Sequence, residues 1–575
     1  MRIALAQLNL TVGAFDGNFQ KIAGAVERAK AAAADLVVFS ELATTGYPPR
    51  DLLTQPSFVD RNLAMLDRVA ALSTASLAIL IGYVDRNPSA SGKPLYNAVA
   101  LCSNGQVVER RHKLLLPTYD VFDEDRYFEP GSSVQPMTLA DWHIGASICE
   151  DVWNDPSFWP QRRYHRDPVA ELASSGVDVM INISASPFEL QKADLRRRLI
   201  RQEAVKHKAY FFYVNQVGGN DELVFDGHSI GIDPDGNEIV RLKDFEEDFA
   251  VVDVPDARKP GPGVSRPGPE VRRPGPEDPA LADTTSLLRP VSTSDEETAY
   301  RALVLGLRDY VRKCGFSSVV LGLSGGIDSA LTACLAVDAL GKEHVHTVAM
   351  PARYSSQHSL DDAAALAAAL GVHHTVIPID PVFQRYLDVL SPAFAGRDED
   401  VTEQNIQARV RGGVLMALSN KFGHLLLTTG NKSELAVGYC TLYGDMCGGL
   451  AVISDVPKTL VYRLSRYVNR ERTIIPESTL TKAPSAELRP NQTDQDTLPP
   501  YDVLDQIVEA YVERNLDADA IVARGIDAAV VRDVIRRIDG SEYKRRQAAP
   551  GIKLSTKAFG VGRRFPIAAE YSRGT

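Results

Sequence analysis

The sequence predicts an α/β protein made of two domains. Short apolar runs alternate with helix-like stretches along both halves of the 575-residue chain. A Pro/Gly-rich segment separates the halves, and in the second half two glycine turns each join a strand to a helix. Such alternation is typical of layered α/β folds, and the chain is too long for one ordinary hydrophobic core.

The domain boundary is predicted at residues 259–279, which read KPGPGVSRPGPEVRRPGPEDP and contain the unit RPGPE twice. Proline and glycine at this density form neither a helix nor a central strand, so the segment is expected to be a semi-extended connector. We therefore expect one domain over residues 1–255, a connector over residues 256–290 and a second domain over residues 291–575. Whether the connector packs on either domain stays open.

In the first half, apolar runs predict strands and two longer stretches predict helices. The strands are expected at residues 3–8, 36–39, 78–83, 97–101, 144–148, 179–183 and 210–215, and the helices at residues 18–33 and 194–207. The turn signal SNG at residues 103–105 predicts a hairpin. This pattern is that of a layered α/β domain.

The second half alternates more regularly. Strands are expected at residues 318–323, 346–350, 374–377 and 425–428, and helices at residues 330–340 and 360–370. Strand–helix–strand units of this length predict a parallel, doubly wound sheet.

The composition and the net charge disfavour several classes of binding partner. The 44% apolar content is that of a globular protein, and the formal net charge of −11 argues against a general nucleic-acid or membrane-surface role. No run reaches the roughly 18 apolar residues of a membrane helix, and the start MRIALAQLNLTVG is predicted as a strand rather than a secretory signal. Six cysteines form no CxxC pair, so neither a disulfide framework nor a zinc site is expected. We expect a cytoplasmic protein with no nucleic-acid and no membrane partner.

The loop SGGIDS at residues 324–329 follows a predicted strand and opens a predicted helix. Two glycines leave backbone N–H groups uncovered, and the helix N-terminus adds partial positive charge, so the loop can cradle pyrophosphate. The patterns GxxxxGK[ST] and GxGxxG do not fit, which disfavours a P-loop NTPase and an ordinary dinucleotide fold. The alternative is a simple glycine turn capped by Asp328 or Ser329.

The loop resembles the SGGxDS loop of the PP-loop ATP pyrophosphatases, which cleave ATP to AMP and pyrophosphate. The resemblance implies an adenine nucleotide alpha hydrolase-like, doubly wound domain. It also implies that the loop holds the pyrophosphate end of ATP through Ser324, Gly325, Gly326, Asp328 and Ser329.

A second motif, LLLTTGNKSELAVGYCTLYGD at residues 425–445, again runs from a strand through a glycine turn into a helix. A magnesium ion on ATP needs one or two carboxylates, and Asp328 and Glu434 are the natural pair. The segment from residue 293 to 575 resembles the NAD synthetase family, and PSAELRPNQTDQDTLPPYDVLD matches its glutamine-dependent members. The resemblance implies an ATP contact at Thr429 and contacts to deamido-NAD at Asn405, Arg409, Asp445 and Lys458. Arg353 and Ser355 fit the family more loosely.

In the first half, Glu41, Lys113 and Cys149 each follow a predicted strand. A cysteine nucleophile needs a base to take its proton and a cation to stabilise the oxyanion, which Glu41 and Lys113 can supply. Taken singly, Cys149 is also explained as a core residue, Glu41 as a turn cap and Lys113 as a surface cation. Only their combination points to catalysis.

The segments FSELATTGYPPRDLL, RHKLLLPTYDVFDEDRYF and SICEDVW resemble the three catalytic segments of the nitrilase (carbon–nitrogen hydrolase) superfamily. The resemblance implies an α-β-β-α domain with Glu41 as general base, Lys113 at the oxyanion, Cys149 as nucleophile and Glu124 orienting the lysine. For a glutaminase of this class it further implies glutamine contacts at Tyr119, Glu150, Ser186 and Lys192. It assigns no role to Asp151.

Together, the two resemblances imply ATP-dependent amidation of deamido-NAD through an acyl-adenylate, with ammonia released from glutamine. The substrates are then glutamine, ATP and deamido-NAD, the cofactor is Mg²⁺, and a large homo-oligomer is expected. One alternative is an AMP-forming amidotransferase acting on another carboxylate. The other is a ligase whose first domain is an inactive scaffold.

Overall fold

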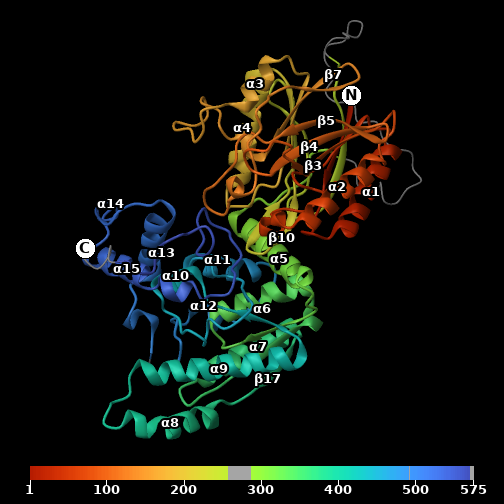
Figure 1. The fold of residues 1–575 in the computed structure, drawn as a ribbon. Helices are drawn as coiled ribbons and strands as arrows, with labels where there is room; N and C mark the ends of the chain where they lie inside the picture. Colours follow the sequence, from red (N-terminus) through yellow and green to blue (C-terminus); the bar gives the residue numbers. More distant parts are fainter. Residues whose placement is uncertain (257–285, 491, 570–575) are drawn as a thin grey trace. The chain divides into compact units, whose positions relative to one another are not determined.

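The computed structural model describes residues 1–256, 286–490 and 492–569, so both RPGPE units lie outside the described residues. The chain divides into two compact units (Figure 1). One comprises residues 1–220 and 224–292, and the other comprises residues 221–223 and 293–575. Among the described helices, each is too short or too polar to cross a lipid bilayer.

The first unit contains two six-stranded sheets. One has the order β14-β1-β2-β3-β4-β5, with the bounds Asp248–Asp253, Arg2–Gln7, Leu36–Val38, Ala78–Arg86, Leu95–Ser103 and Gln106–His112. The other has the order β13-β12-β9-β8-β7-β6, with the bounds Glu238–Arg241, Ile230–Ile232, Tyr210–Asn215, Val179–Ser184, Trp142–Ile148 and Met137–Leu139. The hairpin expected at SNG is confirmed, because β4 and β5 pair antiparallel around it.

Helices cover the outer faces of these sheets. Helices α1 (Phe15–Ala31) and α2 (Pro56–Ala70) lie on one side, and α3 (Pro168–Ser174) and α4 (Lys192–His207) lie on the other (Figure 1). The layers are therefore α-β-β-α, as expected.

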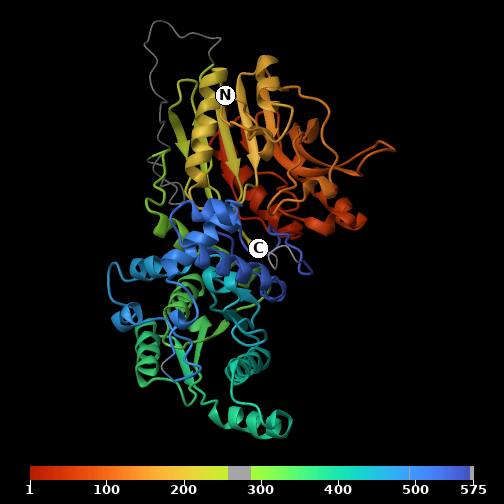
Figure 2. The ribbon, with the colours of Figure 1, turned by 90° about the vertical axis from the view of Figure 1, so that its left-hand side faces the viewer.

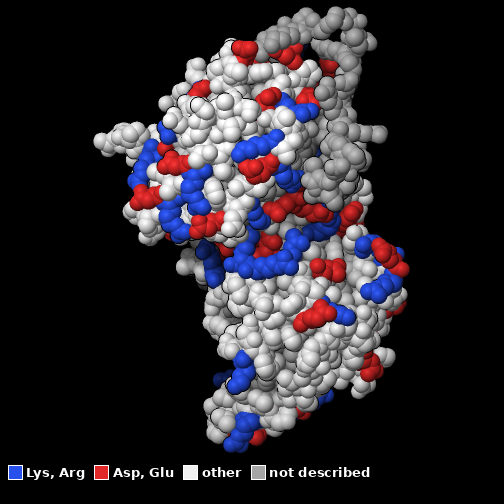
Figure 3. Space-filling view, turned by 90° about the vertical axis from the view of Figure 1, so that its right-hand side faces the viewer, with Lys and Arg blue, Asp and Glu red and all other residues white. Residues whose placement is uncertain are grey.

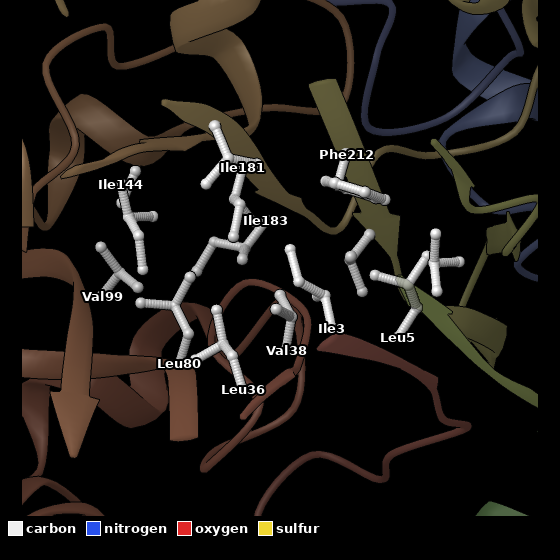
Figure 4. Packing of buried hydrophobic residues seen from close by; sticks show 14 of the residues in the cluster. Ile3, Leu5, Leu36, Val38, Leu80, Val99, Ile144, Ile181, Ile183 and Phe212 are labelled. Atoms are coloured by element: carbon white, nitrogen blue, oxygen red, sulfur yellow. The ribbon is translucent and has the colours of Figure 1, made fainter. Parts of the chain in front are cut away.

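The core of this unit lies between the two sheets. Alternate residues of β2, Leu36 and Val38, face Ile181 and Ile183 of β8 across the layer (Figure 4). All four side chains are fully buried. Because side chains alternate along a strand, this two-residue spacing places each apolar pair on the inner face.

The second unit contains a parallel sheet of five strands, in the order β17-β16-β15-β18-β19. Their bounds are His373–Val376, Val345–Ala349, Val319–Gly322, Leu425–Thr428 and Leu450–Ala451. The strand order reverses between β15 and β18, and ligands of open parallel sheets bind at such a switch point. The predicted doubly wound sheet is confirmed.

Helices surround this sheet (Figure 2). They are α5 (Asp295–Lys313), α6 (Ile327–Leu340), α7 (Gln357–Leu370), α8 (Asp380–Phe394), α9 (Val401–Phe422), α10 (Lys432–Val437), α11 (Lys458–Val468) and α12 (Glu477–Thr481). The chain then forms a helical cluster of α13 (Tyr501–Val508), a π-helical turn (Glu509–Glu513), α14 (Ala518–Val522), α15 (Ala528–Gly540) and α16 (Glu542–Arg545), whose apolar side chains pack against α10.

The helices expected at residues 18–33, 194–207, 330–340 and 360–370 all begin two or three residues earlier in the structure. Their first turns carry polar or capping residues, which apolar periodicity does not detect.

On the face shown in Figure 3, acidic and basic side chains lie next to one another. The prediction that nucleic acid is not a partner stays a prediction.

Candidate active sites

The first site lies in the first unit, where three strands end. Glu41 follows β2, Lys113 follows β5, and Cys149 follows β7 and opens a short 3-10 turn, Cys149–Val152. All three side chains are buried, with relative exposures of 0%, 0% and 3%. Glu41 and Lys113 are 72 positions apart in the sequence, and Lys113 and Cys149 are 36 apart, yet the fold brings all three together in the core.

Lys113 is at the centre of a hydrogen-bonded charge network. Its Nζ lies 2.8 Å from Oε1 of Glu41 and 2.8 Å from both carboxylate oxygens of Glu124. The hydroxyl of Tyr47 donates to Glu124 at 2.8 Å, and Nδ2 of Asn97 donates to Glu41 at 2.7 Å. Two carboxylates therefore fix the position of the ammonium, and hydrogen bonds from Tyr47 and Asn97 fix the carboxylates.

Burial and charge set the protonation of this site. Burial, and after it the negative charge of Glu41, raises the pKa of the Cys149 thiol well above its usual range, although Lys113 opposes the shift. Burial acts to lower the pKa of Lys113, but Glu124 and Glu41 outweigh it and raise that pKa. Burial raises the pKa of Glu124 to about 6 against the opposing charge of Lys113. At rest, the site therefore holds a neutral thiol beside an ammonium.

Asp151 ties the nucleophile turn to the lysine segment. Its Oδ1 accepts the N–H groups of Leu114 and Leu115 at 3.0 and 2.9 Å, and its Oδ2 accepts the N–H of Ile148 at 3.1 Å. Those residues directly follow Lys113 and directly precede Cys149, whose φ of +43° lies in the left-handed region. Non-glycine residues occupy this region at a cost, so the turn needs such support.

Glu150 forms a second cluster with two tyrosines. The hydroxyl of Tyr119 lies 3.0 Å from each Glu150 oxygen, and the hydroxyl of Tyr164 donates to Oε1 at 3.1 Å. Burial raises the pKa of Glu150 although both hydroxyls and nearby lysines oppose the shift. The structure thus brings together Tyr119 and Glu150, both expected to contact glutamine, and adds Tyr164.

The other two residues expected at glutamine lie on the segment that enters α4. The N–H of Ala185 donates to Oε2 of Glu41 at 2.9 Å, and Ser186 follows it, buried, with its N–H on Oδ1 of Asn215 at 3.0 Å. The Nζ of Lys192 donates to the carbonyl of Pro187 at 3.0 Å, and its charge opposes the rise in the pKa of Glu150 that burial causes. Both residues are therefore near the catalytic network, although neither side chain joins it.

The second site begins at the SGGIDS loop between β15 and α6. Gly325 has φ +81°, and a Cβ there would lie 2.2 Å from the carbonyl oxygen of Ser359. The hydroxyls of Ser324 and Ser329 lie 3.2 Å apart, and Oγ of Ser329 donates to the carbonyl of Gly326 at 2.9 Å. The loop is compact because only glycine fits at position 325.

Lys458 pairs with both carboxylates of the expected metal site. Its Nζ lies 2.6 Å from Oδ2 of Asp328 and 3.0 Å from Oε1 of Glu434. Burial acts to lower the pKa of Lys458, but the two carboxylates outweigh it and raise that pKa. Burial raises the pKa of Glu434 to about 7 despite the lysine. Lys458 was expected at deamido-NAD, and the structure places it between the two acidic groups.

A cavity of about 480 Å³ opens over this site. The residues expected at ATP or deamido-NAD that line it are Ser324, Gly326, Asp328, Ser329, Thr429, Asn405, Glu434, Asp445 and Lys458. Arg409 lies outside its lining, exposed, and donates from Nε to the carbonyl of Leu442 at 3.2 Å. Arg411, on the same helix, lines the cavity instead, as does Ser355, whereas Arg353 does not.

Asn405 and Asp445 meet at Thr441. The hydroxyl of Thr441 donates to Oδ1 of Asn405 at 2.8 Å, and its N–H donates to Oδ1 of Asp445 at 2.7 Å. Burial raises the pKa of Asp445 to about 6. Two residues that are 40 positions apart therefore form one polar wall.

Asp494 lines the acidic side of the cavity and is held there by Tyr501. The Tyr501 hydroxyl donates to Oδ2 of Asp494 at 2.8 Å and reaches Glu434 at 3.4 Å. The sequence predicts no role for either residue, although both lie in the stretch PSAELRPNQTDQDTLPPYDVLD, which resembles the glutamine-dependent enzymes. Tyr164 had no comparable signal, because it lies in an irregular loop.

The fold and the two sites define a carbon–nitrogen hydrolase joined to an ATP-using synthase. Family models agree, since the carbon-nitrogen hydrolase model matches residues 2–259 and the NAD synthase model matches residues 299–548. The glutamine-dependent NAD(+) synthetase of Synechocystis sp. is 48% identical over 99% of each chain. The chain belongs to the glutamine-dependent NAD(+) synthetase family.

Further relatives cover the chain equally well. The glutamine-dependent NAD(+) synthetase of Thermotoga maritima is 44% identical over 99% of this chain and 98% of its own. The solved structure of the Acinetobacter baumannii enzyme with adenosine diphosphate is 38% identical, covers 98% of both chains and has a TM-score of 0.74. The predicted family is thereby confirmed.

Proposed function

We propose how the residues of this chain carry out the reaction of its family, the ATP-dependent amidation of deamido-NAD with nitrogen from glutamine. We assign the glutaminase to residues 1–255 and the ligase to residues 291–575, joined by residues 256–290. The observation that carries the proposal is the buried, hydrogen-bonded set of Glu41, Lys113 and Glu124, whose charges act on the Cys149 thiol. An inactive scaffold has no need of buried charges, which are costly to maintain.

In the glutaminase, Glu41 takes the proton from Sγ of Cys149 as the sulfur attacks the side-chain amide carbon of glutamine. The amide oxygen becomes an oxyanion, which the Lys113 ammonium stabilises. Glu41 then passes the proton to the departing nitrogen, and ammonia leaves a thioester. Water, deprotonated by Glu41, hydrolyses the thioester, so that glutamate forms and the thiol is restored.

Glutamine recognition is assigned to the cluster around Glu150. The Glu150 carboxylate, aligned by Tyr119, binds the α-amino group, because a buried carboxylate favours a cationic partner. Ser186 and Lys192 are further contacts on the segment that also carries the N–H donor to Glu41.

In the ligase, the SGGIDS loop and the N-terminus of α6 bind the pyrophosphate end of ATP. Ser324, Gly325, Gly326, Asp328 and Ser329 form this loop, and Thr429 is a further ATP contact on the cavity wall. The nicotinate carboxylate of deamido-NAD attacks the α-phosphorus, the bond to pyrophosphate breaks, and an acyl-adenylate forms. Ammonia attacks the activated carboxyl carbon, and AMP leaves as the amide forms.

Contacts to deamido-NAD are assigned to the polar wall of the cavity. Asn405 and Asp445 are positioned there by Thr441. Arg409 was expected beside them, but Arg411 lies on the cavity and is the better-placed cation of this helix. Lys458 lines the same cavity, and its two carboxylate partners leave the third N–H of the ammonium for the substrate.

A magnesium ion fits between Asp328 and Glu434. No group of three or more metal-ligating side chains occurs in the part of the chain that the structure describes, so these two carboxylates would hold the ion together with ATP oxygens. Both already contact one cation, the Lys458 ammonium, which supports a shared positive charge at this place. When bound, magnesium neutralises charge on the phosphates.

The test is incubation with glutamine, ATP, Mg²⁺ and deamido-NAD, followed by product analysis. We expect NAD, AMP, pyrophosphate and glutamate in equal amounts. Consumption of ATP and glutamine without NAD would instead support an amidotransferase for another carboxylate.

A cytoplasmic location and a homo-oligomeric state stay predictions.

A further inference from the structure

Two charged residues of the ligase cavity stand at the starts of two helices. Lys458 is the first residue of α11, and Glu434 lies in the first turn of α10. Their side chains meet at 3.0 Å between Nζ and Oε1. The geometry of the pair therefore depends on how the starts of the two helices are held relative to one another.

Ser433 joins the two helix starts directly. Its buried hydroxyl oxygen accepts the backbone N–H of Lys458 at 2.8 Å. The first N–H groups of a helix have no partner within that helix, and a side chain at the preceding residue often accepts one. The residue before α11 is Pro457, whose side chain makes no such hydrogen bond. The acceptor for α11 thus comes from α10.

Asp505, on α13, binds both helix starts with one carboxylate. Its Oδ1 accepts the hydroxyl of Ser433. Its Oδ2 accepts the backbone N–H and the hydroxyl of Thr459 at 2.9 and 2.7 Å. An ionised carboxylate can only accept hydrogen bonds, so the Ser433 proton points to Asp505 and the lone pairs of the hydroxyl are left for the N–H of Lys458.

The residues that Asp505 contacts are the chain neighbours of cavity residues. Ser433 precedes Glu434, and Thr459 follows Lys458. Asp505 itself is not among the described residues that line the cavity, whereas Glu434 and Lys458 both are. Any effect of Asp505 on the bound substrates is therefore transmitted through the two helix starts.

We propose that Asp505 is a positioning residue of the ligase, which holds the starts of α10 and α11 together and so keeps Glu434 where it can share a magnesium ion with Asp328. The inference rests on the proposed ligase function and extends it to the helical cluster that follows the parallel sheet. Residues that orient a metal ligand act on metal affinity without touching the metal.

The test compares Asp505→Ala with Asp502→Ala, which removes an exposed carboxylate from the same helix. Calorimetry gives the dissociation constant of α,β-methylene-ATP, which cannot be cleaved between its α- and β-phosphates, with Mg²⁺ and with EDTA. The ratio of the constant in EDTA to that in Mg²⁺ measures how much the metal strengthens binding. We expect Asp505→Ala to lower this ratio about 10-fold, as for the loss of a group that orients a metal ligand. Asp502→Ala should keep the wild-type ratio.

A second variant, Ser433→Ala, removes the hydroxyl that joins Asp505 to α11. Because contacts within one hydrogen-bond network are not independent, the double variant should lower the ratio by less than the product of the two single factors. Asp505→Asn keeps the shape of the side chain and one acceptor oxygen, so it should fold where the alanine variant does not and give a smaller decrease. The rate of NAD synthesis from added ammonium chloride should fall in the same order.

Three outcomes would overturn the inference. The first is a wild-type ratio in Asp505→Ala or, where that variant does not fold, in Asp505→Asn. The second is an equal loss of affinity with and without Mg²⁺, which would indicate general damage to the cavity instead of a displaced carboxylate. The third is a double variant whose effect equals the product of the single effects. If Mg²⁺ does not strengthen binding to the wild type, the magnesium assignment itself is wrong, and this inference falls with it.

Discussion

The Nζ of Lys458 lies 2.6 Å from Oδ2 of Asp328, although 130 residues separate them. The same ammonium reaches Glu434 at 3.0 Å, so one buried cation balances both carboxylates that we assign to magnesium. Lys458 therefore keeps the acidic groups of the ligase site together before substrate arrives. Removing one partner of a buried ion pair leaves charge uncompensated, which is more costly than the pair is stabilising.

Lys458→Met should lower the stability of the ligase unit by about 3–5 kcal/mol, because Asp328 and Glu434 lose their shared counter-charge. Added Mg²⁺ should restore part of the loss. The measurement is thermal unfolding with and without Mg²⁺, compared with Lys421→Met, which removes an exposed lysine on α9. Equal melting temperatures of the two variants would contradict this role.

Cys149→Ala should abolish NAD synthesis from glutamine, by more than roughly 10³-fold, because no other group can form the thioester. Synthesis from added ammonium chloride should persist, since the ligase residues are untouched. Product formation with each nitrogen source gives the answer. Loss of both activities would argue against separate sites.

Asp151→Asn should slow the glutaminase by roughly 10- to 100-fold in kcat, because the amide nitrogen of asparagine would face a backbone N–H that the carboxylate now accepts. KM for glutamine should change little, since Asp151 positions the catalytic segments and does not contact substrate. The matched control is Asp67→Asn at an exposed site on α2. A rise in KM with unchanged kcat would place Asp151 at substrate instead.

The buried position of Asp151 also predicts a pH effect on stability. Burial raises its pKa to about 7 from the usual value of 3.8, so the folded protein binds this proton more tightly than the unfolded chain. Its contribution to stability is then complete below about pH 4 and is lost as the pH rises through 7, by at most about 1.4 kcal/mol per pH unit. Urea unfolding from pH 5 to pH 8 should give a flatter profile for Asp151→Asn. Parallel profiles would contradict the shift.

Gly325→Ala should destabilise the ligase unit by roughly 1–3 kcal/mol or more, because the added Cβ meets the Ser359 carbonyl and the backbone is left-handed. Gly326→Ala is the matched control, since the nearest atom to a Cβ there is the flexible Ser324 hydroxyl at 3.3 Å. Thermal unfolding distinguishes the two. Equal stability would mean that the loop can relax.

Local pattern predicted the placement of the reactive groups. Glu41, Lys113 and Cys149 follow strands whose apolar runs are plain in the sequence, and a strand end fixes where its next residues emerge. The parallel sheet of the second unit and the glycine loop were predictable for the same reason.

Contacts between distant segments were not predictable in this way. The pairing of Lys458 with Asp328 depends on how α11 packs beside α6, which no local periodicity encodes. Arg409 and Arg411 are two residues apart on α9 and so point to different sides of the helix, and motif matching does not say which side meets the cavity. Tyr164 lies in an irregular loop whose course follows from the buried Asn154.

The neutral state of Cys149 has a consequence for its reaction with oxidants. Peroxide oxidises the thiolate form of cysteine, and the sulfenic acid that results can proceed to irreversible products. Because burial and Glu41 keep the thiol protonated, the resting nucleophile is a poor target for such oxidants. The sulfur becomes reactive only when Glu41 takes the proton in the presence of substrate. The same arrangement therefore protects the sulfur from oxidation between turnovers.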